Sequence, residues 1–207
     1  MAVLEEISFY KGHRDEVPNQ LLAKKLAAKE DKLGITEIAE NIWNKNKNIQ
    51  SDCLKVLYEI GYIKPELIAD YVTDFLKSLK SKNNRMVWGS MIALATIARL
   101  KRDQIWKSIS EVENVINTGS VITKVWGIKT LAEVSAGNEI YLKRTFPFIL
   151  KELETCESKL IPKHTENIIV AVNMQNKDNL KSVLESRKKD LKESQLKRIE
   201  KILKTLN

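Results

Sequence analysis

The chain has 207 residues, of which 43% are hydrophobic and 30% are charged, and its formal net charge at pH 7 is +8. This composition favours a folded protein and excludes an intrinsically disordered one. No apolar run reaches the roughly 18 residues that cross a bilayer, so we expect a cytoplasmic protein that does not bind membranes.

Two helices are predicted in residues 18–48. Ile35, Ile38 and Ile42 are three and four residues apart, the spacing of an amphipathic helix, and we expect another helix from about Pro18 to Glu30 before them. Because this part follows the pattern of the later chain only weakly, we interpret it as a degenerate terminal repeat.

The middle of the chain repeats itself. The stretch "VWGSMIALATIARL" at 87–100 is followed by "VWGIKTLAEVSAG" at 125–137, and alignment of their leucines gives a period of 37 residues. The period defines repeats at 49–82, 83–119 and 120–157, each predicted to be a pair of helices. Seven columns are apolar in all three copies, namely Leu54, Met91, Ile128; Leu57, Leu94, Leu131; Ile60, Ile97, Val134; Ile68, Ile105, Leu142; Val72, Ile109, Phe146; Phe75, Val112, Ile149; and Leu79, Ile116, Leu153.

Small residues and prolines agree with these repeats. Cys53, Ser90 and Gly127 share one more column, four residues before the shared leucine, where small side chains let a neighbouring helix approach closely. Pro65 is expected in the first turn of a second helix. Pro147 falls inside the second helix of its repeat, and we predict a kink there.

Toward the C-terminus the pattern weakens again. Ile168 and Ala171 continue the apolar columns and predict a helix from about Pro162 to Met174. The tail that begins "LKSVLESRKKDLKESQ" has the pattern of two more amphipathic helices. Residues 160–207 are therefore interpreted as a second degenerate terminal repeat, and 1–207 as a single domain.

The helix "VWGSMIALATIA", with its small residue, the short turn and the second helix "DQIWKSISEVENVI" resemble a HEAT-repeat or armadillo-like α-solenoid over roughly residues 18–190. The resemblance implies an all-α, right-handed superhelix of about five to six helical hairpins. It also implies that the second helix of each repeat lines a concave surface. The candidate partner-binding residues on that surface are Tyr71, Asp74, Lys77, Trp106, Lys107, Asn114, Arg144, Phe148 and Lys151.

The aromatic residues have more than one interpretation. Trp88 and Trp126 are predicted to pack between neighbouring repeats. Phe148 has either of two roles: an exposed aromatic at a binding surface, or a filler of the gap that a kink at Pro147 would leave.

Residues that carry chemistry are few and far apart. The two cysteines, Cys53 and Cys156, and the two histidines, His13 and His164, have no partners at metal-ligand spacing. No glycine-rich phosphate-binding loop is present in the sequence. We therefore expect no metal, no cofactor and no catalytic residue, with reduced cysteines that serve in packing and histidines that are structural or on the surface.

We expect a non-enzymatic scaffold that binds a protein or peptide along its concave face. The alternative is a nucleic-acid-binding protein, and the size, helical repeats and basic charge are similar to those of the HEAT-like alkylpurine DNA glycosylases. The Trp-Asp pair of those enzymes has no match here, and Asp103 near Trp106 is the only local substitute.

A nucleic acid would bind at Lys107, Arg144 and Lys151. A protein-binding chain would bind duplex DNA only weakly, through the tail residues Arg187, Lys188 and Lys189.

The small column generates a first prediction. Gly127→Leu should lower the free energy of unfolding by about 1 to 3 kcal/mol, because overpacking a close helix contact forces side chains and backbone apart. The surface change Lys129→Gln should be nearly neutral in the same thermal melts. Equal melting temperatures for Gly127→Leu and the parent chain would contradict the packing column.

Overall fold

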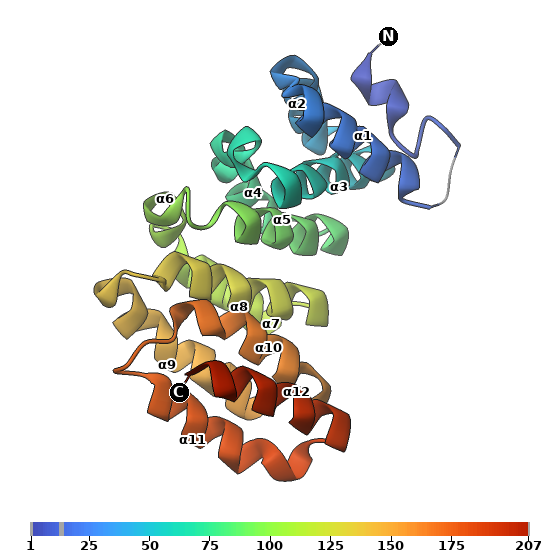
Figure 1. The fold of residues 1–207 in the computed structure, drawn as a ribbon. Coiled ribbons are helices and arrows are strands. Elements are labelled where there is room, and N and C mark those ends of the chain that lie inside the picture. The colour runs from blue at the N-terminus through green and yellow to red at the C-terminus, as the bar shows by residue number, and fades with distance from the viewer. Residues whose placement is uncertain (1, 13–14, 207) are drawn as a thin grey trace. The chain divides into compact units, whose positions relative to one another are not determined.

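The computed structural model describes residues 2–12 and 15–206, which form twelve α-helices and several short 3-10 helices, with no β-strand among them (Figure 1). This confirms the predicted all-α class. The α-helices are α1 (Val17–Lys29), α2 (Lys32–Glu40), α3 (Lys47–Ile63), α4 (Val72–Ser78), α5 (Asn84–Ile97), α6 (Arg102–Trp106), α7 (Ile109–Thr118), α8 (Val121–Ser135), α9 (Glu139–Thr155), α10 (Ile161–Ile168), α11 (Lys177–Arg187) and α12 (Glu193–Leu203).

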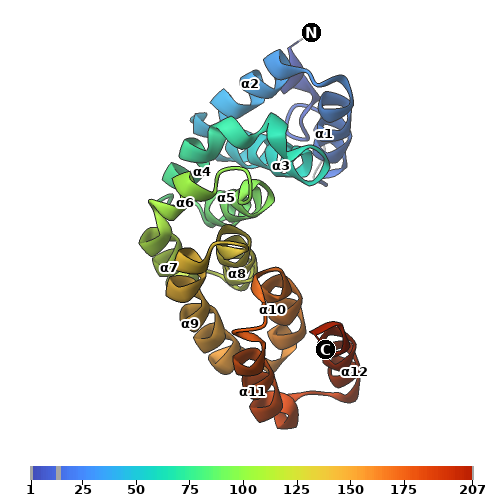
Figure 2. The ribbon, with the colours of Figure 1, turned by 60° about the vertical axis from the view of Figure 1, so that its left-hand side comes forward.

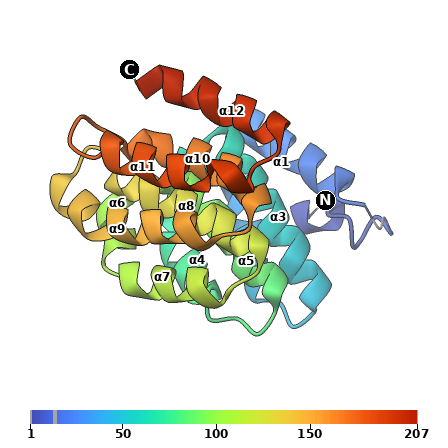
Figure 3. The ribbon, with the colours of Figure 1, turned by 90° about the horizontal axis from the view of Figure 1, so that it is seen from below.

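The described residues form two compact units: unit 1 ends at Trp126 and unit 2 starts at Gly127. In unit 1 the first helices of the hairpins, α1, α3 and α5, form one row, and the second helices α2, α4 and α7 form the other (Figure 2). In unit 2, α10 lies beside α12 and α11 lies beside α9 (Figures 2 and 3). The single domain over 1–207 stays a prediction.

The seven apolar columns form the core of the repeats. Each of their twenty-one side chains is buried, and the most accessible of them, Leu142, is only 9% exposed. Burial of about 25 cal/mol per Å² of apolar surface is the main force available to hold such hairpins together. The 37-residue period in the sequence therefore corresponds to the set of side chains that each hairpin buries.

The N-terminal repeat has its apolar residues buried as predicted, whereas the predicted helix of the C-terminal repeat is too long. Ile35, Ile38 and Ile42 are buried in α2 and the 3-10 turn after it, as predicted. The helix predicted to reach Met174 is too long, because α10 ends at Ile168 and a 3-10 turn ends at Ala171. The Asn176 side chain stabilises the end of this helical segment. It accepts from the backbone N–H of Asn173 at 2.8 Å and donates to the carbonyl of Ala171 at 3.0 Å.

The second helices of unit 1 are broken, whereas α9 of unit 2 is continuous. Pro65 opens a 3-10 helix (Pro65–Leu67), another (Ala69–Tyr71) follows, and only then does α4 begin. Helix α9 runs through Pro147 without interruption. Pro147 and Lys143 are both exposed, so the carbonyl that loses its donor lies on the solvent side. A kink at Pro147 stays a prediction.

Close helix packing depends on two small columns. Cys53 and Ser90 are 0% exposed and Gly127 is buried, in keeping with the predicted column. The second column, which sequence analysis missed, holds Gly61, Ala98 and Ser135, also 37 residues apart and all buried. A Cβ atom on Gly61 would clash with Oγ1 of Thr96 on α5 and would lie 3.0 Å from Cβ of Thr96, so a side chain there would push the two helices apart.

Arg187 at the end of α11 caps the C-terminus of α9. Its guanidinium donates to the carbonyls of Leu153 and Cys156, both at 2.8 Å, and of Glu154, while Nε donates to Asp190 at 2.6 Å. Its side chain is only 14% exposed. A cation in this position satisfies carbonyls that a helix end leaves without donors. Arg187 is therefore structural, and weak DNA binding by the tail, which stays a prediction, would depend on Lys188 and Lys189.

Arg187→Ala should lower the free energy of unfolding by about 2 to 3 kcal/mol, because it removes charge-assisted hydrogen bonds from the end of α9. Arg187→Lys should recover only part of this loss, since an ammonium cannot reach all three carbonyls in a planar fork. Chemical denaturation measures both. The control is Lys189→Ala, an exposed residue two positions away. Equal stability of the Arg187→Ala and Lys189→Ala variants would contradict the capping role.

Candidate interaction surface

The outward side of α4, α6 and α7, with the 3-10 turn before α4, is called here the second-helix face of unit 1. It carries six of the nine residues predicted to bind a partner. Lys77, Lys107 and Asn114 are exposed, and Tyr71, Asp74 and Trp106 are half-buried. All six are therefore accessible in part, but whether the second helices line a concave surface stays a prediction.

One polar contact occurs twice along this face. The indole N–H of Trp43 donates to Oδ1 of Asp74 at 3.2 Å, and Nζ of Lys80 lies 3.4 Å from Oε1 of Glu111. Trp43 and Lys80 are 37 residues apart, and so are Asp74 and Glu111, so the two contacts are the same position in successive repeats. Trp43 is 50% exposed, and the sequence did not predict it as a surface aromatic. Its position 37 residues before the charged Lys80 was the available signal, because equivalent positions of a repeat share their exposure.

Two more contacts link neighbouring second helices. The hydroxyl groups of Thr36 and Tyr71 are 2.9 Å apart. Nζ of Lys101 donates to Oδ1 of Asp70 at 2.7 Å, and this hydrogen bond holds the pKa of Asp70 below its ordinary value. Polar side chains of the predicted surface thus also join adjacent hairpins.

A pocket of about 370 Å³ lies between α4 and the α6–α7 pair. It brings together the predicted residues Lys77 and Lys107, which come from different columns of the repeat. Lys80 and Glu111 also line it, and the other lining residues are Thr73, Leu76, Gln104 and Ser108. Three ammonium groups and one carboxylate leave the lining net positive. The pocket can therefore accept an anionic group through direct hydrogen bonds.

The other three predicted residues lie on α9 of unit 2. Arg144 and Lys151 are exposed, and Phe148 is half-buried. None of the three lines the pocket of about 420 Å³ that surrounds Pro147 and extends to Asn173 and neighbouring asparagines. Both interpretations of Phe148 therefore stay open, as an exposed contact residue and as a packing residue beside Pro147.

Aromatic side chains also gather along the first helices of unit 1. The ring centroids of Tyr58 and Trp88 are 6.2 Å apart, which confirms that Trp88 packs between neighbouring repeats. Trp126 instead contacts Tyr62, which belongs to α3, two repeats earlier; their ring centroids are 5.7 Å apart. Burial raises the pKa of Tyr58 to about 12, so its hydroxyl stays neutral at physiological pH.

The cysteines and His164 lie in the core. Burial raises the pKa of Cys156 to about 11 and raises that of Cys53 as well, which keeps both thiols protonated and weakly nucleophilic. His164 is buried in α10, whereas His13 lies outside the described residues. No group of three or more histidine, cysteine or acidic side chains in 2–12 and 15–206 is placed to hold a metal ion. Nor is any described helix long and apolar enough to cross a membrane.

Comparisons with known proteins show the fold. No protein-family model and no curated protein matches the chain. Among solved structures it is similar to an engineered protein, with a TM-score of 0.68 and 15% identity over 99% of this chain and 96% of that one. It is also similar to a designed armadillo repeat protein in complex with the peptide (KR)4, with a TM-score of 0.67 and 15% identity over 91% of this chain and 87% of that one. The chain has an armadillo/HEAT-like helical-repeat fold.

Proposed function

We propose that the protein is a non-enzymatic repeat scaffold that binds a protein or peptide partner on the second-helix face of unit 1. The observation that carries this proposal is the pocket between α4 and α6–α7, which is lined by three lysines, Lys77, Lys80 and Lys107, and by a single carboxylate, Glu111. A partner segment with an acidic side chain would place its carboxylate there, where Lys77 and Lys107 can donate to it.

The surroundings of the pocket support a polypeptide ligand. Trp43, Tyr71 and Trp106 are partly exposed on the same row of second helices, and aromatic side chains of this kind are common anchors in protein interfaces. Hairpins joined by ion pairs and a packed core offer a preformed surface, so little conformational entropy is lost when a partner binds.

The comparison with the designed armadillo repeat protein supports the same class of ligand. That protein was solved with a peptide, (KR)4, which is basic. The pocket described here is lined by lysines, so we infer the opposite charge for the partner segment. We keep Arg144, Phe148 and Lys151 as a second proposed contact region on α9.

Carboxylates interspersed among the lysines favour a protein over a nucleic acid. Asp70 holds Lys101, and Glu111 lies beside Lys80, so a phosphate backbone that runs along this face would meet both carboxylates, whereas a single acidic side chain needs only Lys77 and Lys107. For the glycosylase alternative, Asp103 and Trp106 lie on the short helix α6, and neither lines the pocket. Both cysteines are free and buried, which fits our proposal of a cytoplasmic location.

Selection of a displayed random-peptide library against the full chain tests the proposal. The enriched sequences should carry Asp or Glu next to an aromatic or apolar residue. The double variant Lys77→Gln/Lys107→Gln should weaken binding of the selected peptide at least about tenfold, since two charge-assisted hydrogen bonds are lost. Fluorescence anisotropy with labelled peptide provides the affinities.

The matched control is Lys45→Gln/Lys47→Gln, which also removes two exposed lysines from unit 1 but leaves the pocket intact. Its affinity for the peptide should equal that of the parent chain. Enrichment of basic sequences, or equal losses in the two double variants, would contradict the proposal. Tight binding of a labelled DNA duplex at physiological salt that is lost in Lys107→Glu/Arg144→Glu/Lys151→Glu would favour the nucleic-acid alternative instead.

A further inference from the structure

The N-terminal segment, residues 2–12, is fixed to the first hairpin by side-chain acceptors. The backbone N–H groups of Val3 and Leu4 donate to the carboxylate of Glu37, both at 3.1 Å. Further along, the N–H of Ser8 donates to Asn19 at 2.9 Å. Ile7 between these anchors is 0% exposed. The segment is therefore an ordered part of unit 1 and can form one wall of a binding site.

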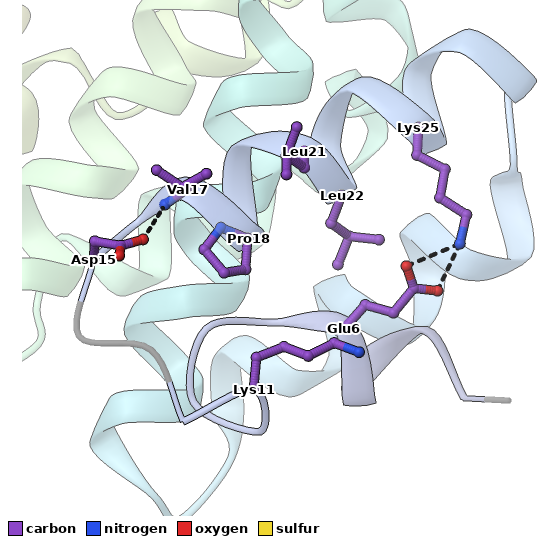
Figure 4. A pocket seen from close by; sticks show the side chains of 8 residues that line it. All are labelled: Glu6, Lys11, Asp15, Val17, Pro18, Leu21, Leu22 and Lys25. Carbon is purple, nitrogen blue, oxygen red and sulfur yellow. Dashed lines mark hydrogen bonds and ion pairs between the residues drawn. The ribbon is translucent and has the colours of Figure 1, made fainter.

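A hollow of about 440 Å³ lies between this segment and α1 (Figure 4). Helix α1 contributes four apolar residues, Val17, Pro18, Leu21 and Leu22, and the charged Lys25. Val17 is 53% exposed and Leu21 is 60% exposed, so the segment covers the outer side of α1 only in part. The volume lies in the range of small-molecule sites, and an apolar wall of this kind favours a hydrocarbon group.

Two carboxylates, Glu6 and Asp15, and two lysines, Lys11 and Lys25, line the hollow. The carboxylate of Glu6 accepts from Nζ of Lys25 at 2.6 and 2.8 Å, so these two charges neutralise each other (Figure 4). Asp15 accepts the N–H of Val17 at 3.0 Å and thereby holds the start of α1. Lys11 makes no ion pair within residues 2–12 and 15–206, and its side chain lines the hollow.

We propose that this hollow binds a small amphipathic carboxylate. The hydrocarbon chain would lie on Val17, Leu21 and Leu22, and the carboxylate would accept hydrogen bonds from the ammonium group of Lys11. The hollow shares no lining residue with the pocket between α4 and α6–α7. It is thus independent of the proposed peptide surface, and either site can fail its test without affecting the other.

Titration of the isotope-labelled full chain with octanoate, followed by amide chemical shifts, tests the proposal. The shifts should be confined to residues 3–11 and 15–25, with a dissociation constant of about 1 mM, as expected for a ligand of about ten heavy atoms. Octylammonium has the same chain and the opposite charge, and it should bind at least about fivefold more weakly. Lys11→Gln should weaken octanoate about fivefold and leave 1-octanol unchanged.

Two pairs of matched variants separate the site from general effects. Lys24→Gln removes another exposed lysine of α1 and should not change the affinity for octanoate. Leu21→Gln should abolish binding, whereas Leu33→Gln, at a leucine 85% exposed outside the hollow, should not. Both leucines are exposed, so thermal melts should show intact folds. Octanoate shifts elsewhere in the chain, equal binding of octylammonium, or an unchanged affinity in Lys11→Gln would overturn the proposal.

Discussion

Burial of apolar columns between neighbouring hairpins is the constraint on which the rest of the structure depends. A single hairpin cannot remove its apolar stripe from water alone, so the hairpins within each unit must pack on one another. Leu57, Leu94 and Leu131 are 0% exposed because each occupies the same position in this packing. Small residues such as Gly61 let the helices approach closely enough for the columns to meet.

This packing also determines what the outer positions can do. Because the core columns take one side of each second helix, the remaining positions face outward at a regular spacing. The pairs Trp43–Asp74 and Lys80–Glu111 occupy equivalent positions in successive repeats. The first is a hydrogen bond from an indole N–H, and the second is an ion pair. Where the lysines outnumber their acidic partners, the face becomes able to bind an anionic group. The proposed peptide surface is therefore a local excess of positive charge on the outward positions of the repeated hairpins.

Sequence analysis predicted the core because the core is periodic, and it failed where contacts depend on local breaks or on distant residues. All seven columns were visible at a spacing of 37. Lys77 and Lys107 belong to different columns, so the period did not predict that they line one pocket; Lys107 lies at the break between α6 and α7. Arg187 looked like a surface cation until its carbonyl partners, more than thirty residues earlier, were located. The N-terminal segment has no periodicity, so nothing in the sequence indicated its anchors, such as Glu37.

Hydrogen–deuterium exchange of the full chain, with and without a selected acidic peptide, tests the assigned surface most directly. Binding on the second-helix face of unit 1 should slow exchange in α4, α6 and α7, which span Val72–Ser78, Arg102–Trp106 and Ile109–Thr118. Exchange in the first helices α3 and α5 should be unchanged, since their core packing is already formed without a ligand. Protection confined to α3 and α5, or to unit 2, would contradict the assignment of the surface.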